Sequence, residues 1–416
     1  MNPAKAAPSR RADPESATAF QRLNTLLDGL EPGQDPIVLT VGEPRHALPS
    51  FVGPVISANL DDFRRYPPIR GTDEFRKTVA DWLDRRYRLG GLIDPDRHVL
   101  PLNGSREGLF YAAFTAADML AKDNPAILLP NPYYHPYSLG AAKSGAEAVY
   151  LDAREASGFL PDLDALDAGL LDRTIAFYFA SPANPQGAVA PLDYWCKLIG
   201  LARKHRFYVF ADECYSEIYR DTPPPGVLQA ARGMGGDLSN IVAFNSLSKR
   251  SNLAGLRCGI AAGDADFIAQ WTTLRNSAAP QVPMPNQAVA VAAFSDERHV
   301  EENRRLYNAK FEAAETILGP TFGYKKPEGG FFVWLDVSRF GGGVEAAKRL
   351  WLEQGVKVVP GAYLARTQSD GSNPGTNFIR LAMVEDIDTT RRALVRIAAL
   401  AGTVAGATGA QGAAEG

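Results

Sequence analysis

The chain has few of the residues from which metal centres and disulfide frameworks are built. Its 416 residues include three cysteines and five histidines. Cys196, Cys214 and Cys258 show no paired spacing and the histidines are scattered, so we expect neither a bound metal nor a disulfide framework. The chain also lacks an apolar run long enough to span a bilayer. These absences argue against zinc-binding, disulfide-rich and transmembrane classes.

An excess of either charge is missing as well. The 44 Lys and Arg residues nearly balance the 47 Asp and Glu residues, for a formal net charge of -3. Nothing in this balance favours nucleic acid or an anionic membrane as a partner. Residues 1–11 carry charge but lack the apolar segment of a secretion signal. We therefore expect a cytoplasmic protein.

The length of the chain indicates two lobes, because one core rarely grows to this size. Residues 1–16 are polar and residues 401–416 are almost entirely Ala, Gly, Thr and Gln, so we expect both tails to be disordered. We assign residues 46–300 to a large domain. Residues 17–45 and 301–400 are expected to form a smaller α+β domain.

Short apolar runs alternate with helix-like stretches in the large domain. The runs predict buried strands over 126–129, 174–179, 207–210 and 241–244, and the longer stretches predict helices over 109–120, 193–205 and 286–294. The smaller domain is predicted to contain a helix over 301–318 and strands over 330–335, 356–359 and 378–381. This alternation predicts an α/β fold with a mostly parallel sheet covered on both faces. Ligands bind beyond the carboxyl ends of such strands.

A lysine follows the predicted strand 241–244 within the sequence Ser246-Leu247-Ser248-Lys249, and Arg257 lies eight residues further on. A lysine that forms a Schiff base needs a lowered pKa, which apolar surroundings and nearby cations provide. Hydroxyl and guanidinium groups at the same strand end suit a phosphate dianion. The pattern indicates pyridoxal phosphate bound covalently to Lys249. The serine acylases share the Ser-x-x-Lys pattern, but their companion motifs are absent here.

Polar residues follow two further predicted strands. Asp212 ends one of them and could hold a cofactor's ring nitrogen protonated, while Tyr215 and Asn184 could bind its phenolic oxygen. Taken singly, Asp212 could be a helix cap and Asn184-Pro185 only a turn. Because polar clusters follow consecutive predicted strands, we favour the interpretation that these residues form one site together.

A possible phosphate site also lies in the segment from Asn103 to Glu107. Gly104 and Ser105 precede a predicted helix, whose exposed amides could bind phosphate, although a plain capped helix start is equally compatible with this segment. The glycine-rich motifs of nicotinamide and ATP sites are absent.

With these motifs, the chain resembles the fold-type I aminotransferases of class I/II from about Leu39 to Ile397. The resemblance implies a large domain with a mostly parallel seven-stranded sheet, the cofactor pyridoxal 5'-phosphate, and amino-acid and 2-oxo-acid substrates. It implies that Lys249 binds the cofactor and moves the substrate proton, with Asp212 on the pyridine nitrogen and Asn184 and Tyr215 on the phenolic oxygen.

The same resemblance extends to the remaining binding positions. The residues placed near the phosphate are Gly104, Ser105, Arg106, Ser246, Ser248 and Arg257, and Tyr134, or alternatively Tyr133, aligns with the aromatic residue that stacks on the ring. Arg380, together with Gly42 and Asn184, falls where the family binds the substrate α-carboxylate. Gln186 departs from the usual Asn-Pro-Thr-Gly turn, at a position that does not touch the cofactor.

Tyr66 matches a tyrosine that reaches the phosphate of a neighbouring subunit, which implies a homodimer with active sites at the interface. On its own, Tyr66 reads as an aromatic residue of a surface turn.

Several segments, including residues 41–46 and 359–366, resemble the N-succinyl-diaminopimelate aminotransferases of bacterial lysine biosynthesis. The implied substrate carries an additional carboxylate, which Arg45, Arg250 or Lys326 could bind. The more ordinary interpretation is that these three side chains face solvent or support the phosphate. Alternatives are an aminotransferase for aspartate, alanine or aromatic amino acids, or a carbon–sulfur lyase. A ligand-sensing module of a transcription regulator would need a DNA-binding domain for which about 38 residues are too few, and a catalytically idle binding protein conflicts with the full catalytic set.

Overall fold

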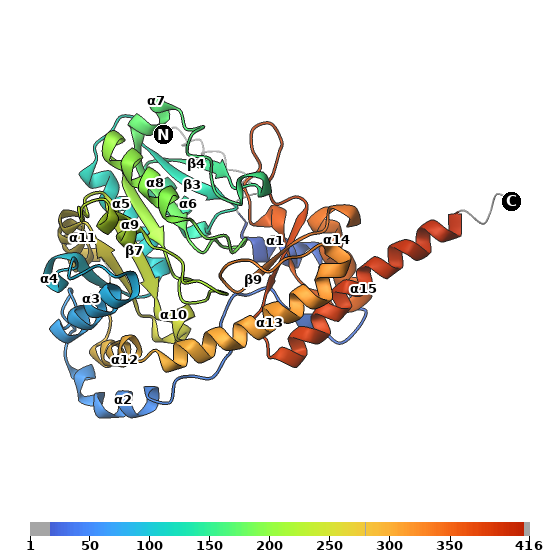
Figure 1. Cartoon of the computed structure of the whole chain (residues 1–416), viewed down its shortest axis with the longest axis horizontal. Helices are drawn as coiled ribbons and strands as arrows, with labels where there is room; N and C mark the ends of the chain where they lie inside the picture. The colour runs from blue at the N-terminus through green and yellow to red at the C-terminus, as the bar shows by residue number, and fades with distance from the viewer. Residues whose placement is uncertain (1–16, 279, 412–416) are drawn as a thin grey trace, which may run out of the picture.

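The computed structural model describes residues 17–278 and 280–411, and its centre is a seven-stranded sheet (Figure 1). The strands run across the sheet in the order β2 (Val99–Leu102), β8 (Gly259–Gly263), β7 (Ile241–Ser246), β6 (Tyr208–Asp212), β5 (Thr174–Ala180), β3 (Ala126–Asn131) and β4 (Glu147–Asp152). Strand β8 is antiparallel to both of its neighbours. The other pairs are parallel, which confirms the predicted mostly parallel sheet.

The sequence identified four of these strands and missed three. Strand β8 is built from Gly, Ile and Ala, β2 contains Pro101, and the residues of β4 are all at least partly exposed. None of these three segments has the continuous run of large apolar residues by which a buried parallel strand is recognised.

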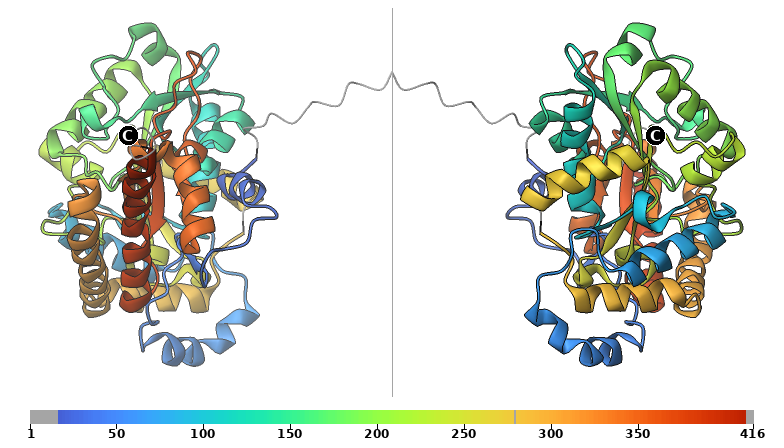
Figure 2. Two further views of the ribbon diagram at one scale, coloured as in Figure 1. Left: turned by 90° about the vertical axis from the view of Figure 1, so that its right-hand side faces the viewer. Right: turned by 90° about the vertical axis from the view of Figure 1, so that its left-hand side faces the viewer.

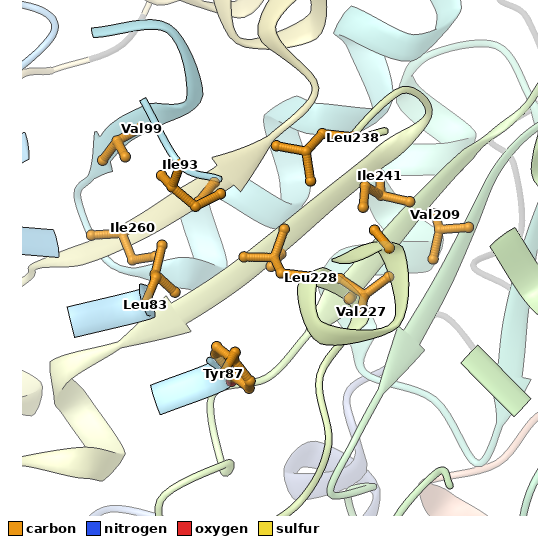
Figure 3. Close-up of a cluster of buried hydrophobic side chains, with 14 of the residues drawn as sticks. Leu83, Tyr87, Ile93, Val99, Val209, Val227, Leu228, Leu238, Ile241 and Ile260 are labelled. Atoms are coloured by element: carbon orange, nitrogen blue, oxygen red, sulfur yellow. The ribbon is translucent and has the colours of Figure 1, made fainter. Parts of the chain in front are cut away.

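Helices cover both faces of the large sheet because side chains alternate along each strand. On β6, Val209 and Ala211 belong to the core beneath one face, whereas Tyr208 and Phe210 belong to the core beneath the other. The first face is covered by α3 (Asp73–Tyr87), α8 (Leu192–His205), α9 (Val227–Gly233) and α12 (Met284–Ser295), and the second by α5 (Ser105–Met119), α6 (His135–Lys143) and α11 (Ala265–Ala278). Figure 3 shows how Val227 and Leu228 of α9 lie against Ile241 and Val209 of the sheet.

A second core lies in the smaller lobe. Its three-stranded sheet has the order β11 (Val359–Pro360), β12 (Phe378–Ala382) and β9 (Phe332–Asp336), and it packs with α13 (Arg298–Phe322), α14 (Gly342–Gln354) and α15 (Ile387–Gln411). The segment before Gly42 joins this lobe, because β1 (Ile37–Val38) pairs with β10 (Val356–Lys357). The predicted strand 356–359 is thus divided between two sheets at Val358.

The ends of the chain differ in part from expectation. Helix α15 continues to Gln411, so the expected tail from Ala401 onwards begins as helix (Figure 1). The expected tail of residues 1–16 and the last residues, 412–416, lie outside the described part. Helix α1 (Ala19–Leu26) packs on β11, whereas α2 (Val52–Ala58) lies at the edge of the molecule (Figure 2). Shorter helices are α4 (Pro95–His98), α7 (Ala168–Arg173) and α10 (Leu247–Arg250).

Three parallel strands end side by side and supply the polar segments identified in the sequence. Strands β5, β6 and β7 are neighbours that run in the same direction, so Ala180, Asp212 and Ser246 lie at one edge of the sheet.

The described residues include no helix that is both long and apolar enough to cross a membrane.

Candidate functional site

A cavity of about 790 Å³ opens at this edge of the sheet and is lined by residues of both lobes. The structure brings most of the predicted site residues to its wall, namely Gly42, Ser105, Arg106, Tyr134, Asn184, Asp212, Tyr215, Lys249, Arg257 and Arg380. Gly104, Ser246 and Ser248 lie beside the cavity rather than in its lining. The alternative ring-stacking residue, Tyr133, lines the cavity as well.

Lys249 lies in α10, which starts directly after β7 because the Ser246 hydroxyl accepts a hydrogen bond from the amide of Ser248. Burial lowers the pKa of the Lys249 amine to about 8, and the nearby cations Arg106 and Arg380 act in the same direction. The amine donates a hydrogen bond to the Gly42 carbonyl. A pKa near 8 leaves a useful fraction of the amine uncharged, and therefore nucleophilic, close to neutral pH.

Asp212 is buried at the end of β6, with its carboxylate at the cavity wall. The Tyr137 hydroxyl donates a hydrogen bond to its Oδ2 at 2.6 Å, and the Cys214 amide donates to its Oδ1 at 3.2 Å. The carboxylate therefore caps the following turn and also faces the cavity. Tyr137 was not among the expected site residues, although it follows Tyr134 at helical spacing.

Arg380 reaches the cavity from β12 of the smaller lobe. Its guanidinium donates to the Asn184 side-chain oxygen at 3.3 Å and to the Thr40 carbonyl at 2.9 Å. Its Nε is buried and has no hydrogen-bond partner in the described part of the chain. Burial lowers the pKa of Arg380 to about 10, so the group remains charged at neutral pH. Such a site suits a carboxylate, which accepts from two guanidinium nitrogens at once.

The start of α5 and Arg257 form another part of the cavity wall. Helix α5 begins at Ser105, after Gly104 in the left-handed region with φ of 83°. The Arg257 guanidinium donates to the carbonyls of Ala254 and Asn103. A Cβ on residue 104 would lie 2.3 Å from Arg257 Nη2, so only glycine leaves room for the guanidinium. Free amides at a helix start beside a fixed guanidinium suit a phosphate.

Aromatic side chains enclose the rest of the cavity. The Tyr134 hydroxyl accepts a hydrogen bond from Arg106 Nε at 3.0 Å, and its ring packs edge-on against Tyr137. Tyr215 packs edge-on against Phe331 at 5.2 Å between ring centroids. Burial raises the pKa of Tyr215 well above its usual value, so its hydroxyl remains protonated and able to donate.

The structure adds a wall that the sequence did not reveal. Arg22 of α1 lines the cavity, and its guanidinium lies 4.1 Å from the ring centre of Tyr363. No hydrogen bond or ion pair from this guanidinium to a described residue is present beyond that ring contact. Its position depends on the packing of Leu23 of α1, and of Leu27 directly after it, against Val359, a long-range contact without a local sequence signal.

The three cations proposed for a distal carboxylate lie elsewhere. Arg45 is paired with Glu385, Lys326 lies 3.7 Å from Glu315, and neither lines the cavity. Arg250 is buried, donates to Glu297 at 2.6 Å and to the Ala293 carbonyl at 2.7 Å, and is likewise absent from the wall.

Tyr66 also lies away from the cavity. It is 96% exposed in this chain.

Comparison with known proteins identifies the family. Residues 34–397 match the family model described as aminotransferase class I and II. The LL-diaminopimelate aminotransferase of Moorella thermoacetica is 30% identical over 386 residues, which cover 91% of this chain and 94% of that protein. The crystal structure of an aminotransferase from Neisseria meningitidis superimposes with a TM-score of 0.88 at 37% identity, covering 92% of this chain and 98% of that one.

A more distant structural neighbour is a probable N-succinyldiaminopimelate aminotransferase from Thermus thermophilus. Its TM-score is 0.79 at 25% identity, and the match covers 92% of this chain and 100% of that one. The match to the family model spans most of the sequence and both lobes. The chain therefore belongs to the class I and II aminotransferases, a family of enzymes that depend on pyridoxal phosphate.

Proposed function

We propose that this aminotransferase acts on N-succinyl-L,L-diaminopimelate, exchanging its amino group with 2-oxoglutarate to give N-succinyl-2-amino-6-oxopimelate and glutamate. In lysine biosynthesis the reaction would run in the reverse direction. The observation that carries the proposal is a guanidinium group in the cavity wall, that of Arg22, beyond those assigned to the cofactor and the α-carboxylate.

The residues present fit pyridoxal phosphate. The cavity combines a lysine whose pKa is lowered, a buried carboxylate at Asp212 and a helix start beside Arg257. Lys249 would hold the aldehyde carbon, Asp212 the ring nitrogen, Tyr215 and Asn184 the phenolic oxygen, and Ser105 and Arg257 the phosphate. When bound, this cofactor supplies an electron sink for the substrate α-carbon.

The chain's own groups then bind the substrate and move its proton. Arg380 binds the α-carboxylate through donors that include its unpaired Nε. This contact fixes the α-carbon close to Lys249, whose amine removes the α-proton and returns it later. The aromatic walls exclude water from the reacting atoms and strengthen both electrostatic contacts.

One guanidinium group of the wall remains after these assignments. Arg257 is assigned to the phosphate, with Arg106 expected beside it, and Arg380 to the α-carboxylate, which leaves Arg22 for a further anion. Arg106 also donates to the Tyr134 hydroxyl, whereas the Arg22 guanidinium contacts the Tyr363 ring and has no hydrogen bond or ion pair to a described residue. A substrate with a carboxylate on a long arm fits this distribution of charge.

The same wall favours the succinylated substrate over free L,L-diaminopimelate. A free distal ammonium needs an acidic partner, and the acids in the described lining are Asp212 and Glu107. Asp212 faces the cofactor position, and Glu107 is paired with the buried Arg275. Succinylation removes that ammonium and adds a carboxylate. Free L,L-diaminopimelate remains the second candidate, because relatives of 28–30% identity carry its name.

The first test follows the visible absorption of the cofactor-loaded enzyme. We expect the resting band to disappear on addition of N-succinyl-L,L-diaminopimelate or glutamate but not aspartate, and the Lys249→Ala variant to lose turnover while keeping its circular dichroism spectrum. Free L,L-diaminopimelate is added in a parallel sample. A faster response to it would replace the proposed substrate, and substantial turnover by Lys249→Ala would overturn the role of that lysine.

Gly104→Ala is expected to weaken cofactor binding, because the new methyl group displaces Arg257 from the phosphate position. Loss of one charge-assisted contact corresponds to a roughly tenfold to hundredfold rise in the dissociation constant of pyridoxal phosphate, measured by fluorescence titration. Gly91→Ala is the matched control, since Gly91 also has positive φ but open space around its Cβ position. Equal affinities of the two variants would contradict the assignment of Arg257.

Arg22→Gln tests the distal carboxylate site. We expect KM for the succinylated substrate to rise roughly tenfold to hundredfold, as for the loss of one charged hydrogen bond, with little change for alanine, which has no distal carboxylate. Arg392→Gln is the control, because Arg392 is exposed and pairs with Thr389 on α15. A proportional change for both substrates would show that Arg22 supports the fold rather than selectivity.

We also propose a homodimer, in which Tyr66 reaches the phosphate of the partner. Leu60 and Phe63, near α2, are 55% and 56% exposed, and Tyr66 is almost fully exposed. Figure 2 shows that α2 protrudes from the molecule. Exposed apolar side chains gathered near it favour a protein interface there.

Phe63→Glu is expected to shift the molar mass in light scattering from dimer toward monomer and to reduce cofactor retention. Val395→Glu, at an apolar residue of α15 that is 57% exposed, should leave the mass unchanged. A dimeric Phe63→Glu variant with full cofactor content would refute this interface.

A further inference from the structure

Three hydrogen-bonded polar side chains, two of them buried and one partly buried, lie beside the cavity and outside its wall. Lys310 and Asn303 of α13 are each 2% exposed, and His46 lies between them. The Lys310 amine is 2.7 Å from His46 Nε2, and His46 Nδ1 is 2.6 Å from Asn303 Oδ1. None of the three lines the cavity, so binding of substrate or cofactor does not account for them.

The hydrogen bonds among Lys310, His46 and Asn303 are consistent with one assignment of donors and acceptors. Lys310 also donates to the Met383 carbonyl at 3.1 Å. An ammonium can only donate, so His46 Nε2 accepts and its proton lies on Nδ1. Nδ1–H then donates to Asn303 Oδ1, which directs the Asn303 amide nitrogen away from His46.

The charge states agree with this arrangement at neutral pH. Burial lowers the pKa of Lys310 to about 8, although Asp386 and Glu385 oppose the change, so the amine is mostly charged at pH 7. Burial is also the largest cause that lowers the pKa of His46, and Lys310 adds to it, while Asn303 and Glu302 act in the opposite direction. A charged lysine beside a neutral imidazole is the pairing that the hydrogen bonds require.

This series of hydrogen bonds continues from Asn303 to the backbone at Lys249. The Asn303 amide nitrogen donates to the Lys249 carbonyl at 3.2 Å and to the Arg250 carbonyl at 3.4 Å. Helix α10 has only four residues, so its last carbonyls cannot all find partners within the helix. A side chain of the smaller lobe therefore stabilises the turn of the large lobe that carries Lys249 (Figure 1).

Aromatic rings provide a second contact between the same groups. The His46 ring lies 4.5 Å from that of Tyr307, which stacks on Phe331 at 5.4 Å between centroids. The Lys249 amine lies 5.1 Å from the Phe331 ring centre. Both ends of Lys249 are thus connected to His46: its carbonyl through Asn303, and its amine through the rings of Phe331 and Tyr307.

We propose that Lys310, His46 and Asn303 are positioning residues, which fix the carbonyls of Lys249 and Arg250 and thereby aim the Lys249 amine into the cavity. This inference rests on the function proposed for Lys249. It does not depend on the identity of the substrate.

Asn303→Asp is the sharpest test, because the variant keeps the shape and the acceptor for His46 but cannot donate to the carbonyls. With glutamate we expect kcat to fall roughly tenfold to hundredfold, the cost of misplacing a reacting group by about 1 Å, and KM to stay within about twofold. In the cofactor-free protein, labelling of Lys249 by trinitrobenzenesulfonate, followed by peptide mapping, should slow severalfold.

Asn308→Asp is the matched control on the same helix. Asn308 donates to the Arg220 carbonyl and does not contact Lys249. Its variant should show normal kcat and labelling even if its thermal stability falls. Equal behaviour of the two variants in both measurements would overturn the proposal.

Lys310→Met removes the first donor without placing a charge near Lys249. It should lower kcat and slow the labelling in the same direction, whereas Lys122→Met should do neither. Like Lys310, Lys122 donates two hydrogen bonds within the protein, in its case to the carbonyls of Thr174 and His205, but it has no contact with α10 among these bonds. Normal labelling in Lys310→Met would limit the positioning role to Asn303 and overturn the three-residue chain.

The outcomes separate this inference from the proposed function. An inactive Lys249→Ala enzyme combined with a normal Asn303→Asp enzyme refutes the inference alone. An active Lys249→Ala enzyme refutes the role of that lysine, whatever the labelling rates show.

Discussion

Burial of the Lys249 amine is the constraint on which the rest of the site depends. An ammonium group taken out of water is stable only if it finds partners or gives up its proton. Here its partners among the described residues are a backbone carbonyl, that of Gly42, and the face of Phe331, and neither is an anion. The cations Arg106 and Arg380 oppose the charge further. The fold therefore holds the amine where its proton is easily lost, and this is useful only if its position is fixed.

Parallel strands explain why much of the site could be predicted from the sequence. Strands β5, β6 and β7 are consecutive and end at one edge, so Asn184, Asp212 and Lys249 meet there by topology alone. The family resemblance added Arg380, whose place in the smaller lobe no local pattern indicates. What remained hidden depends on long-range packing. Arg22 reaches the cavity because α1 packs on β11, and Tyr137 both lines the cavity and donates a hydrogen bond to Asp212.

The cations considered for a distal carboxylate lie away from the cavity for a related physical reason. Arg250 stands next to Lys249 in sequence, and a charged side chain beside a reactive lysine reads as part of the site. In the structure its two terminal guanidinium nitrogens donate to Glu297 and to the Ala293 carbonyl, and Trp82 packs against the guanidinium. Its Nε has no hydrogen-bond partner among the described residues, but Arg250 does not line the cavity, so this nitrogen is not offered to a ligand there. Sequence proximity cannot distinguish that arrangement from an arginine that faces a cavity.

The two lobes contribute to the chemistry in different ways. The large sheet supplies the groups suited to the cofactor, while the smaller lobe supplies Arg380 and the support for Arg22. If Asn303 also fixes the Lys249 carbonyl, the smaller lobe positions the reacting amine through Asn303 and the substrate through Arg380. Displacement of that lobe would then disturb the α-carboxylate and the amine together. Binding energy at Arg380 would therefore be coupled to the orientation of the group that moves the proton.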